Sequence, residues 1–596
     1  MLDATRYANA TEILRSRALA RPEQDALIWV RDPERRAAAH LSYRVLDEQA
    51  RGIAVWLTEH FPAGSRILLL YPPAEFIVAF IGCLYAGMVA VPAPLPGRFP
   101  HERRRVRAIA ANSQAAAVLT DSAHLAALQE WAAAEGLPPL PMTATDTGAV
   151  TGGEADGWTP PTADHTTLAL LQYTSGSTGT PKGVMVSHGN LLVNAATMCE
   201  ALEIPEGTRF GGWAPQYHDM GLMAQTLPAL FLGSTCVLMD PTAFLKRPHH
   251  WLKMIGTYGI GWSAAPNFGY DYCSRKVTDE QLSGLDLSGW RYAVNGSEPV
   301  QAGTMTEFAK RFAAAGFRRE AACPCYGLAE STVFVSGAPN REPVVATVAA
   351  DALATRSFSP DPAARNIREL PSNGAAPQHD VAVVDPETLR RVPPGRIGEL
   401  WLRGPNVAQG YWLNEEATEA TFRARTADGD EGYLRTGDLG TVHHGEIYVT
   451  GRLKDLMIFR GRNLYPQDIE HELRVRHPEL GSVGAVFAAP AIAEDTSDVE
   501  EVLVVTHEVR AGLGPEALAA LAARVKQSVA QDFGVVPAAV CLLRRGGVRR
   551  TTSGKIERSA MRELFGNGEL DSVYAVIDMR TATATAATVR AHGSTD

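Results

Sequence analysis

A chain of 596 residues is too long for a single hydrophobic core, so we expect more than one domain. Hydrophobic residues form 45% of the chain and charged residues 20%, an ordinary globular balance that excludes global disorder. The formal net charge of -10 lacks the basic excess of nucleic-acid-binding domains, so we expect no nucleic-acid partner.

The cysteine content and the apolar stretches indicate in which cellular compartment the protein is expected. Seven cysteines are too few over this length for a disulfide framework, and they suit a reducing compartment. The N-terminus lacks the basic and apolar regions of a secretory signal. The uncharged stretch 76–93 reaches the lower length limit of a membrane-spanning helix, but Gly87 interrupts it and Pro92 ends it. We therefore predict a buried helix and a short strand there, no membrane span, and a cytoplasmic protein.

Short apolar runs that end in turn residues alternate with longer stretches of helical spacing through most of the first 450 residues. The clearest runs occupy residues 66–72, 115–121, 168–174, 234–240 and 291–297. This alternation predicts an α/β fold with parallel-rich sheets and packed helices. In such sheets ligands bind at the carboxyl ends of the strands.

The later part of the chain changes in texture. Glycine- and proline-separated β-type runs end the large N-terminal domain that we expect over 1–450. The charged segment GRLKD at 451–455 is the predicted hinge. A strand-like run and an amphipathic helix that begins at Pro515 then predict a small α+β C-terminal domain over 456–570. The low-complexity tail 571–596 is expected to be disordered.

Residues 172–183, QYTSGSTGTPKG, have the small side chains that let backbone N–H groups approach a phosphate. The spacing does not fit a Walker A loop, because Thr180 and Pro181 separate Gly179 from Lys182. This excludes a P-loop nucleotidase. Two alternatives remain, another nucleotide-activating enzyme or a flexible connection without function.

Other motifs in the chain distinguish these alternatives. TSGSTGTPKG is followed in order by YGLAES at 326–331, YLRTGDLG at 433–440, GRLKD at 451–455 and TTSGKIER around Lys555. Together the five motifs resemble those of the adenylate-forming enzymes, the superfamily of acyl-CoA synthetases, nonribosomal-peptide adenylation domains and luciferases. The resemblance extends over nearly the whole chain.

The resemblance implies an enzyme that uses ATP and Mg²⁺ to convert a carboxylate into an acyl-adenylate, with release of pyrophosphate. Negative charge builds up on phosphate oxygens in such a reaction, so catalysis depends on positioned donors, cations and a metal ion. The residues implied to hold the β- and γ-phosphates are Thr174, Ser175, Gly176, Ser177, Thr178, Gly179 and Lys182.

The same resemblance assigns residues to the rest of the nucleotide. Tyr326 would stack on adenine, and Glu330 would bind Mg²⁺, which prefers carboxylate and phosphate oxygens. Asp438 would accept the ribose hydroxyls. Arg452 would reach the ribose or a phosphate, with a salt bridge at the rim as its alternative. The remaining residues implied at the nucleotide are Asn295, Gly296, Ser297 and Gly327.

Three further residues would act in catalysis or domain movement. Lys555 would place its charge on the α-phosphate and the incoming carboxylate. Lys454 falls at the hinge, where rotation of the small domain would bring Lys555 in for the first step and withdraw it for the second. His218 would lie beside the substrate carboxylate, although a histidine between apolar stretches is more often a core residue.

Four segments resemble fatty acyl-AMP ligases in particular. These segments are YHDMGLM, SAAPNFGYDYC at 263–273, AVNGSEPV at 293–300 and RGRNLYPQDIE at 460–470. Such ligases pass a fatty acyl group to the phosphopantetheine thiol of an acyl carrier protein. They also carry an insertion where residues 343–376 lie, so we expect this segment to pack against the hinge side and to disfavour coenzyme A. No carrier-attachment motif follows Met561, so the holo carrier protein is expected to be a separate chain.

Other functions fit parts of the pattern. A fatty acyl-CoA synthetase would share the adenylation step and use CoA as acceptor. An amino-acid-activating domain is disfavoured, because HDMGL has no acid placed for an α-ammonium group. A non-catalytic relative is disfavoured by the intact Lys182, Glu330, Asp438 and Lys555. Apolar residues of 211–273 are expected to line the acyl tunnel, and they do not indicate whether the chain is medium or long.

Overall fold

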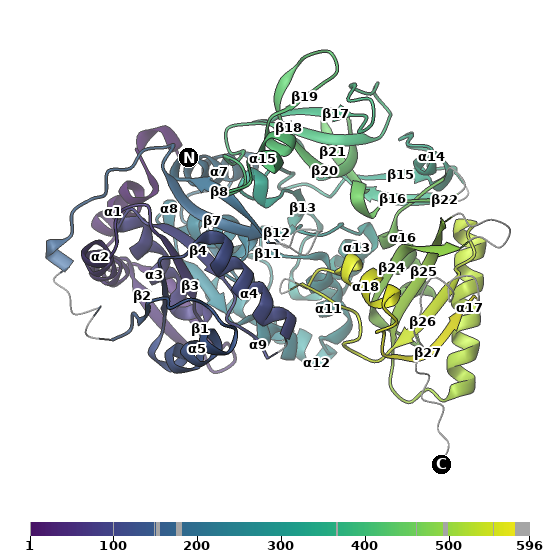
Figure 1. Ribbon diagram of the computed structural model, residues 1–596, viewed down its shortest axis with the longest axis horizontal. Helices are drawn as coiled ribbons and strands as arrows, with labels where there is room; N and C mark the ends of the chain where they lie inside the picture. Colours follow the sequence, from purple (N-terminus) through teal and green to yellow (C-terminus); the bar gives the residue numbers. More distant parts are fainter. Residues whose placement is uncertain are drawn as a thin grey trace.

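Two parallel-rich sheets with helices on their faces form the large part of the chain, and a β-rich unit and a C-terminal α+β unit lie beside them (Figure 1). The expected α/β fold class is confirmed. Among the residues described, no helix is both long and apolar enough to span a bilayer. The structure is a computed structural model, and it describes residues 2–98, 100–147, 150, 155–174, 181–364, 367–459, 462–492, 499–551 and 554–578.

One sheet has six strands in the order β6-β5-β3-β4-β7-β8, parallel except for the pair β7–β8. Its strands are β3 Arg66–Leu70, β4 Val89–Ala93, β5 Ala117–Thr120, β6 Met142–Ala144, β7 Leu168–Thr174 and β8 Lys182–Ser187. The uncharged stretch 76–93 forms the end of helix α3 (Pro73–Tyr85) and strand β4, as predicted. Gly87 connects them at φ +66°, a conformation that glycine adopts without strain.

The other sheet has eight strands in the order β14-β13-β12-β11-β9-β10-β1-β2, and its two outermost pairs are antiparallel. Its strands are β1 Asp25–Asp32, β2 Ala37–Ser42, β9 Arg209–Gly212, β10 Cys236–Met239, β11 Ile260–Ala265, β12 Tyr292–Asn295, β13 Ala322–Tyr326 and β14 Ser336–Gly337. The predicted strands at 234–240 and 291–297 are β10 and β12. Strand β10 pairs with β9 and with the distant β1, whereas β12 pairs with β11 and β13, its neighbours in the sequence.

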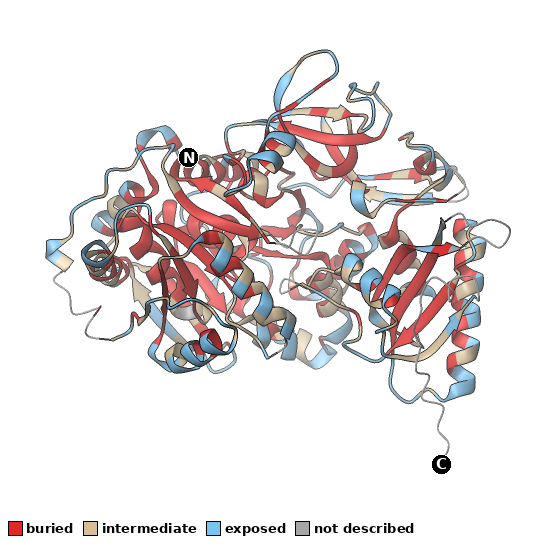
Figure 2. Ribbon diagram, viewed as in Figure 1, coloured by how far each residue is buried: buried red, intermediate tan, exposed pale blue. Residues whose placement is uncertain are grey.

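Helices cover both faces of these sheets, so the strands are buried and the helices expose only their outer sides (Figure 2). In β3, Ile67 and Leu69 face the core between the sheets, and Leu68 and Leu70 face the outer core. The helices between the sheets are α1 Ala10–Ala20, α2 Tyr43–His60, α3, α7 His188–Ala201 and α8 Leu227–Phe231. Those on the outer faces are α4 Pro100–Ser113, α5 Ser122–Ala134, α9 Pro241–Lys246, α10 His249–Tyr258, α11 Asn267–Lys276, α12 Asp279–Leu282 and α13 Ala302–Phe312.

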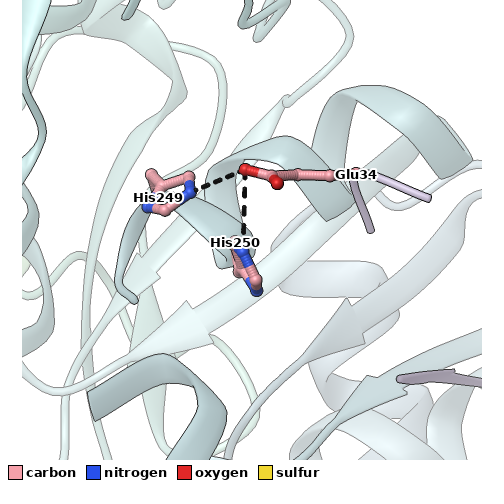
Figure 3. Close-up of side chains that lie close together, drawn as sticks. All are labelled: Glu34, His249 and His250. Atoms are coloured by element: carbon pink, nitrogen blue, oxygen red, sulfur yellow. Dashed lines mark hydrogen bonds and ion pairs between the residues drawn. The ribbon is translucent and has the colours of Figure 1, made fainter. Parts of the chain in front are cut away.

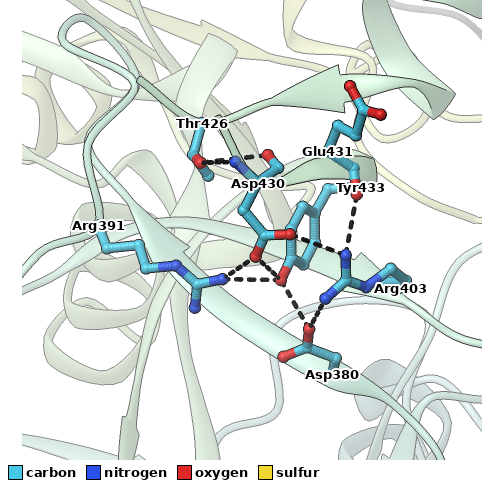
Figure 4. A network of polar contacts seen from close by, with 7 residues as sticks. All are labelled: Asp380, Arg391, Arg403, Thr426, Asp430, Glu431 and Tyr433. Carbon is cyan, nitrogen blue, oxygen red and sulfur yellow. Dashed lines mark hydrogen bonds and ion pairs between the residues drawn. The ribbon is translucent and has the colours of Figure 1, made fainter. Parts of the chain in front are cut away.

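The predicted β-rich region is a five-stranded sheet in which β18 and β20 are central and β21 pairs with β20. Its elements are β17 Asp380–Val384, β18 Gly398–Arg403, α15 Glu415–Phe422, β19 Ala424–Arg425, β20 Glu431–His443 and β21 Glu446–Arg452. A polar network anchors the start of β20 (Figure 4). The Tyr433 hydroxyl oxygen lies 2.6 Å from Asp380 and 2.9 Å from Asp430, and Arg403 pairs with both carboxylates. This network holds the register of the strand that carries Asp438 further along.

The C-terminal unit is a four-stranded sheet in the order β24-β25-β26-β27, drawn in yellow-green in Figure 1. Its elements are α16 Pro466–Arg476, β24 Leu480–Ile492, β25 Val499–Val509, α17 Pro515–Phe533, β26 Ala539–Leu543, α18 Arg558–Gly566 and β27 Ser572–Ile577. Helix α17 begins at Pro515 as predicted, and it buries Leu518, Leu521, Val525 and Val529 against the sheet. Helix α18 packs on the opposite face.

The segment 343–376 forms strand β15 (Val345–Ala349), helix α14 (Ala350–Ala354) and strand β16 (Ile367–Pro371). Two strands that follow 451–455, β22 (Met457–Phe459) and β23 (Arg462–Leu464), lie beside it. Arg462 Nη2 is 2.6 Å from Asp351, and Asn463 Nδ2 donates to the Ala354 carbonyl at 2.9 Å. The segment therefore packs against the chain just past the predicted hinge.

The expectation of a disordered tail from residue 571 is wrong for its first part. Residues 572–577 form β27, which pairs antiparallel with β26 from Ala539 to Leu543. The sequence SVYAVI has a valine, tyrosine and isoleucine content that suits a strand, and edge pairing with β26 satisfies its backbone. Residues 579–596 lie outside the described residues.

We predict that a chain ending at residue 571 is less stable than one ending at residue 578. Each backbone hydrogen bond contributes about 0.5–1.5 kcal/mol net, so loss of the β26–β27 ladder should cost several kcal/mol in the C-terminal unit. Thermal unfolding of the two truncated chains, each compared with the full chain, measures this. Equal unfolding midpoints for the two truncations would contradict the role of β27.

Candidate active site

A cavity of about 1040 Å³ lies where the two sheets, the β-rich unit and the C-terminal unit meet. Its lining residues range from Arg105 to Arg562 along the chain, so tertiary folding alone assembles it. Twelve residues assigned from the sequence line it: Thr174, Lys182, His218, Gly296, Ser297, Tyr326, Gly327, Glu330, Asp438, Arg452, Lys454 and Lys555. Asn295 is buried just behind the lining, and its Nδ2 donates to Asn267 Oδ1 at 3.2 Å. Ser175, Gly176, Ser177, Thr178 and Gly179 lie outside the described residues.

Strand ends position many of these residues. Thr174 and Tyr326 are the last residues of β7 and β13, and Asn295 is the last residue of β12. Thr174 lies opposite Lys182 in the β7–β8 register, so both ends of the glycine-rich segment are placed at the cavity. Gly327 follows Tyr326, and a Cβ atom there would lie 1.6 Å from the Val333 carbonyl oxygen. Close backbone packing therefore requires a glycine at 327.

Asp438 is the centre of a polar triad in which Asp438 and Tyr326 are buried and Arg452 is exposed. The Tyr326 hydroxyl donates to Asp438 Oδ2 at 2.9 Å, and Arg452 Nε lies 2.8 Å from Asp438 Oδ1. The β20–β21 register places Asp438 directly opposite Arg452. Burial, and then the Asp438 charge, raises the pKa of Tyr326, and Asp438 raises the pKa of Arg452. The Tyr326 hydroxyl therefore stays protonated and remains a hydrogen-bond donor. The salt bridge that the sequence left as the alternative role of Arg452 is present.

A second polar group surrounds Glu330. The Tyr411 hydroxyl donates to Glu330 Oε1 at 2.8 Å, and Lys182 Nζ lies 4.8 Å from the centre of the Tyr411 ring. Burial raises the pKa of Tyr411 well above its ordinary value. Within the described part of the chain, Glu330 Oε2 accepts no hydrogen bond. One carboxylate oxygen thus remains for a cation beside Lys182 and Thr174.

Lys555 reaches the cavity from the loop that precedes α18. Its neighbour Gly554 packs on Phe268 of α11, where an added Cβ atom would lie 3.0 Å from the ring. Burial lowers the pKa of Lys555, and the nearby Asp219 and Glu298 carboxylates oppose this shift. Phe268 N donates to Glu298 Oε1 at 2.6 Å, which ties this carboxylate to the large part of the chain.

His218 and Asp219 also line the cavity. His218 Nδ1 lies 2.7 Å from Asp219 Oδ1, and Asp219 accepts from the backbone of Met220, which begins a π-helix, η3 (Met220–Thr226). Burial alone would raise the pKa of Asp219, but His218 and Lys555 hold it well below its usual range. Asp219 is therefore a charged carboxylate at neutral pH.

The lining residues that were not identified from the sequence include Arg105, Asp219, Glu298 and Tyr411. Asp219 and Glu298 lie inside segments that were used only for the family resemblance. Arg105 Nε is buried and, in the described residues, has no hydrogen-bond partner. Burial lowers the pKa of Arg105. Its helix α4 carries four arginines between residues 103 and 107, and the sequence does not indicate which of them faces the cavity.

One wall of the cavity is apolar. Trp262 and Ala264 of β11 belong to the stretch 211–273 that was expected to line an acyl tunnel. Met198 and Leu202 at the end of α7, and Phe334, also line it and lie outside this stretch. These residues meet because α7 packs between the two sheets.

Comparison with known proteins agrees with this geometry. Residues 14–412 match the family model of the AMP-binding enzymes. The medium-chain-fatty-acid–acyl-carrier-protein ligase JamA of Moorena producens is 38% identical over 587 residues, which cover 95% of this chain and 96% of JamA. The long-chain-fatty-acid–AMP ligase FadD32 of Mycolicibacterium smegmatis is 35% identical, with 91% of each chain covered.

A solved structure extends the comparison to three dimensions. The fatty acyl-adenylate ligase of Legionella pneumophila, crystallised with acyl adenylate and pyrophosphate, superposes with a TM-score of 0.73 at 34% identity, and 97% of this chain and 99% of that chain are covered. The family model spans more than half of this chain, and these relatives match it almost from end to end. The chain therefore belongs to the AMP-binding enzyme family and, within it, to the fatty acyl-AMP ligases.

Proposed function

We propose that the protein uses ATP to activate a medium- or long-chain fatty acid as acyl-AMP and then transfers the acyl group to the phosphopantetheine thiol of a separate acyl carrier protein. The observation that carries this proposal is a single cavity in which the charged group of Lys555, Asp438 and Lys182 adjoins an apolar wall with Trp262. A nucleotide needs the charged part, and an alkyl chain needs the apolar part. The names of the relatives support both the acid and the carrier acceptor.

The nucleotide is held by the two polar groups. The Tyr326 ring stacks on adenine, and its hydrogen bond to Asp438 orients that carboxylate toward the ribose hydroxyls. Arg452 neutralises Asp438 from the other side. Lys182 and Thr174, with the glycine-rich segment between them, bind the β- and γ-phosphates. Asn295, Gly296 and Ser297 form the turn that borders the adenine.

The residues present fit a magnesium ion. Mg²⁺ prefers one or two carboxylates together with substrate phosphates, and Glu330 Oε2 has no competing donor among the described residues. Glu330 would hold the ion while Tyr411 orients the carboxylate. When bound, the ion neutralises charge on the phosphates. Every other contribution comes from residues of the chain.

Adenylation is a displacement at the α-phosphorus of ATP. A carboxylate oxygen of the acid attacks this phosphorus, the bond to the bridging oxygen breaks, and the electron pair leaves with pyrophosphate. Lys555 stabilises charge on the α-phosphate and aligns the carboxylate, and His218 also borders the carboxylate. The Asp219 and Glu298 carboxylates raise the pKa of Lys555 against the lowering effect of its burial.

Transfer follows at the carbonyl carbon. The carrier thiolate attacks this carbon, the bond to the AMP oxygen breaks, AMP leaves, and the thiol proton passes to solvent. We assign residues 1–450 and 456–570 to two domains and 451–455, with Lys454, to the hinge. Rotation there withdraws Lys555 and admits the pantetheine arm. The insertion 343–376 contacts the chain beyond the hinge, which supports a role in choosing the acceptor.

We predict that the purified chain forms acyl-AMP and pyrophosphate from ATP, Mg²⁺ and a panel of fatty acids. Lys555→Ala should lower this rate by about 10²–10³, the cost of a lost transition-state contact, while ATP binding persists. Acyl-AMP is measured by mass spectrometry and ATP binding by calorimetry. Lys526→Ala, on α17 outside the cavity lining, is the matched control. Absence of adenylate with every acid would leave only a binding function.

We predict a pH effect of Asp219→Asn. Asp219 raises the pKa of Lys555 against the lowering effect of burial, so removing its charge lowers that pKa further. Lys555 then loses its proton at lower pH, and the alkaline limb of kcat/KM for ATP, which reports the free enzyme, moves to lower pH. Asn keeps an oxygen that can accept from Met220 N. The control is Asp156→Asn, a change at a fully exposed side chain, which should leave the alkaline limb of the pH profile in place. An unmoved limb in Asp219→Asn would refute the coupling between Asp219 and Lys555.

We predict that the insertion governs acceptor choice. Arg368 of β16 contacts the C-terminal unit: its Nε lies 3.5 Å from Asp468 Oδ2, and its Cζ lies 4.8 Å from the centre of the Phe533 ring. Burial raises the pKa of Asp468 to about 6. Replacing 345–371 by a short Gly/Ser linker should leave adenylation unchanged and raise acyl-CoA formation several-fold; Arg368→Ala should act in the same direction, more weakly. Arg423→Ala, an exposed arginine on the β-rich unit, is the control.

Thioester formation with CoA and with a holo carrier protein measures this choice. The unaltered chain should prefer the carrier. Efficient acyl-CoA formation by the unaltered chain would instead identify an acyl-CoA synthetase. An unchanged CoA rate after the deletion would remove the insertion from the explanation.

A further inference from the structure

Two histidines and a glutamate meet on the face of the molecule formed by the β1–β2 edge and α10, and none of them lines the cavity (Figure 3). Glu34 lies in the turn between β1 and β2. His249 and His250 begin helix α10. The turn and the helix are more than 200 residues apart in sequence, and all three side chains point toward one another in Figure 3.

The donor atoms have the spacing of a metal site. Glu34 Oε1 lies 3.0 Å from His249 Nε2 and 3.8 Å from His250 Nε2, and one donor atom from each residue lies within 4.8 Å of the others. Ligands bound tetrahedrally to Zn²⁺ at about 2.0–2.1 Å are about 3.3 Å apart. The two measured distances lie on either side of this value, so small side-chain shifts would place all three donors on one ion.

His250 supplies an independent observation. It is 6% exposed, and its Nε2 atom has no hydrogen-bond partner within the described part of the chain. A buried imidazole nitrogen without a partner carries a desolvation cost that a bound ion would remove.

Charges near the cluster partly balance. Asp32 Oδ1 accepts from Glu34 N at 2.9 Å and from Arg35 N at 3.2 Å, so it fixes the turn that presents Glu34. The partial positive charge at the start of α10 and the nearby Arg247 both disfavour binding of a cation. The carboxylates of Asp32 and Glu34 offset them.

We propose that Glu34, His249 and His250 bind one Zn²⁺-class transition-metal ion, with two imidazole nitrogens and one carboxylate oxygen as ligands. Imidazole ligands select zinc or its neighbours over Mg²⁺, which prefers oxygen alone. The ion cross-links the β1–β2 edge of the eight-stranded sheet to α10. It stabilises this corner and takes no part in adenylation, because the three residues lie outside the cavity lining.

Zinc titration of the full chain tests the proposal. Chelator-treated protein in excess Mg²⁺ is titrated with ZnCl₂ by calorimetry. The unaltered chain should bind one equivalent of zinc, and the double variant His249→Ala/His250→Ala should lose this binding. Glu34→Gln, a change at an exposed side chain, should weaken binding by at least about 10-fold. Zinc should also raise the unfolding midpoint of the unaltered chain and not that of the double variant.

A neighbouring histidine–carboxylate pair provides the matched control. His40 Nδ1 lies 2.9 Å from Asp25 Oδ2 on the same β1–β2 pair, without a second histidine, so His40→Ala should leave zinc binding unchanged. Equal zinc binding by the unaltered chain and the double variant would overturn the site, as would no zinc binding at all. Acyl-AMP formation should persist in every variant, so a failed zinc site and a failed adenylation proposal are told apart.

Discussion

The burial of Lys555 beside Asp219 and Glu298 is the interaction on which the arrangement of the cavity depends. A buried ammonium group is costly unless opposite charges compensate it, and both carboxylates come from the large part of the chain. The lysine comes from the C-terminal unit, so its position requires the two units to meet. Phe268 serves both sides of this contact, because its backbone binds Glu298 and its ring packs on Gly554.

The β-rich unit completes the same cavity through strand register. Tyr433 anchors one end of β20 in a charged network, and the β20–β21 pairing then sets Asp438 opposite Arg452. The Tyr326 hydroxyl joins this pair from the eight-stranded sheet. A slip of one residue would turn Asp438 to the other face of the strand, so the distant network and the polar triad are parts of one constraint.

Much of the fold was predictable from local pattern. Helix α17 follows the spacing of Leu518, Leu521, Val525 and Val529, and Gly87 with Pro92 correctly divided an apolar stretch into a helix and a strand. The tail was misjudged because low complexity after residue 580 hid a short strand before it. A strand of six residues at a sheet edge owes its stability to its partner β26, and that partner is not visible in its own sequence.

The sequence by itself determined the reaction class, because the motifs around Lys182, Tyr326, Asp438 and Lys555 state which groups are present and in what order. It also determined where helices and strands alternate, since side-chain periodicity is local. Only the tertiary structure decided which charges face one another: Arg105 among the arginines of its helix, Glu298 beside Lys555, and Glu34 beside His249 and His250. Such pairings depend on how sheets and helices pack across hundreds of residues, and no local pattern records that distance.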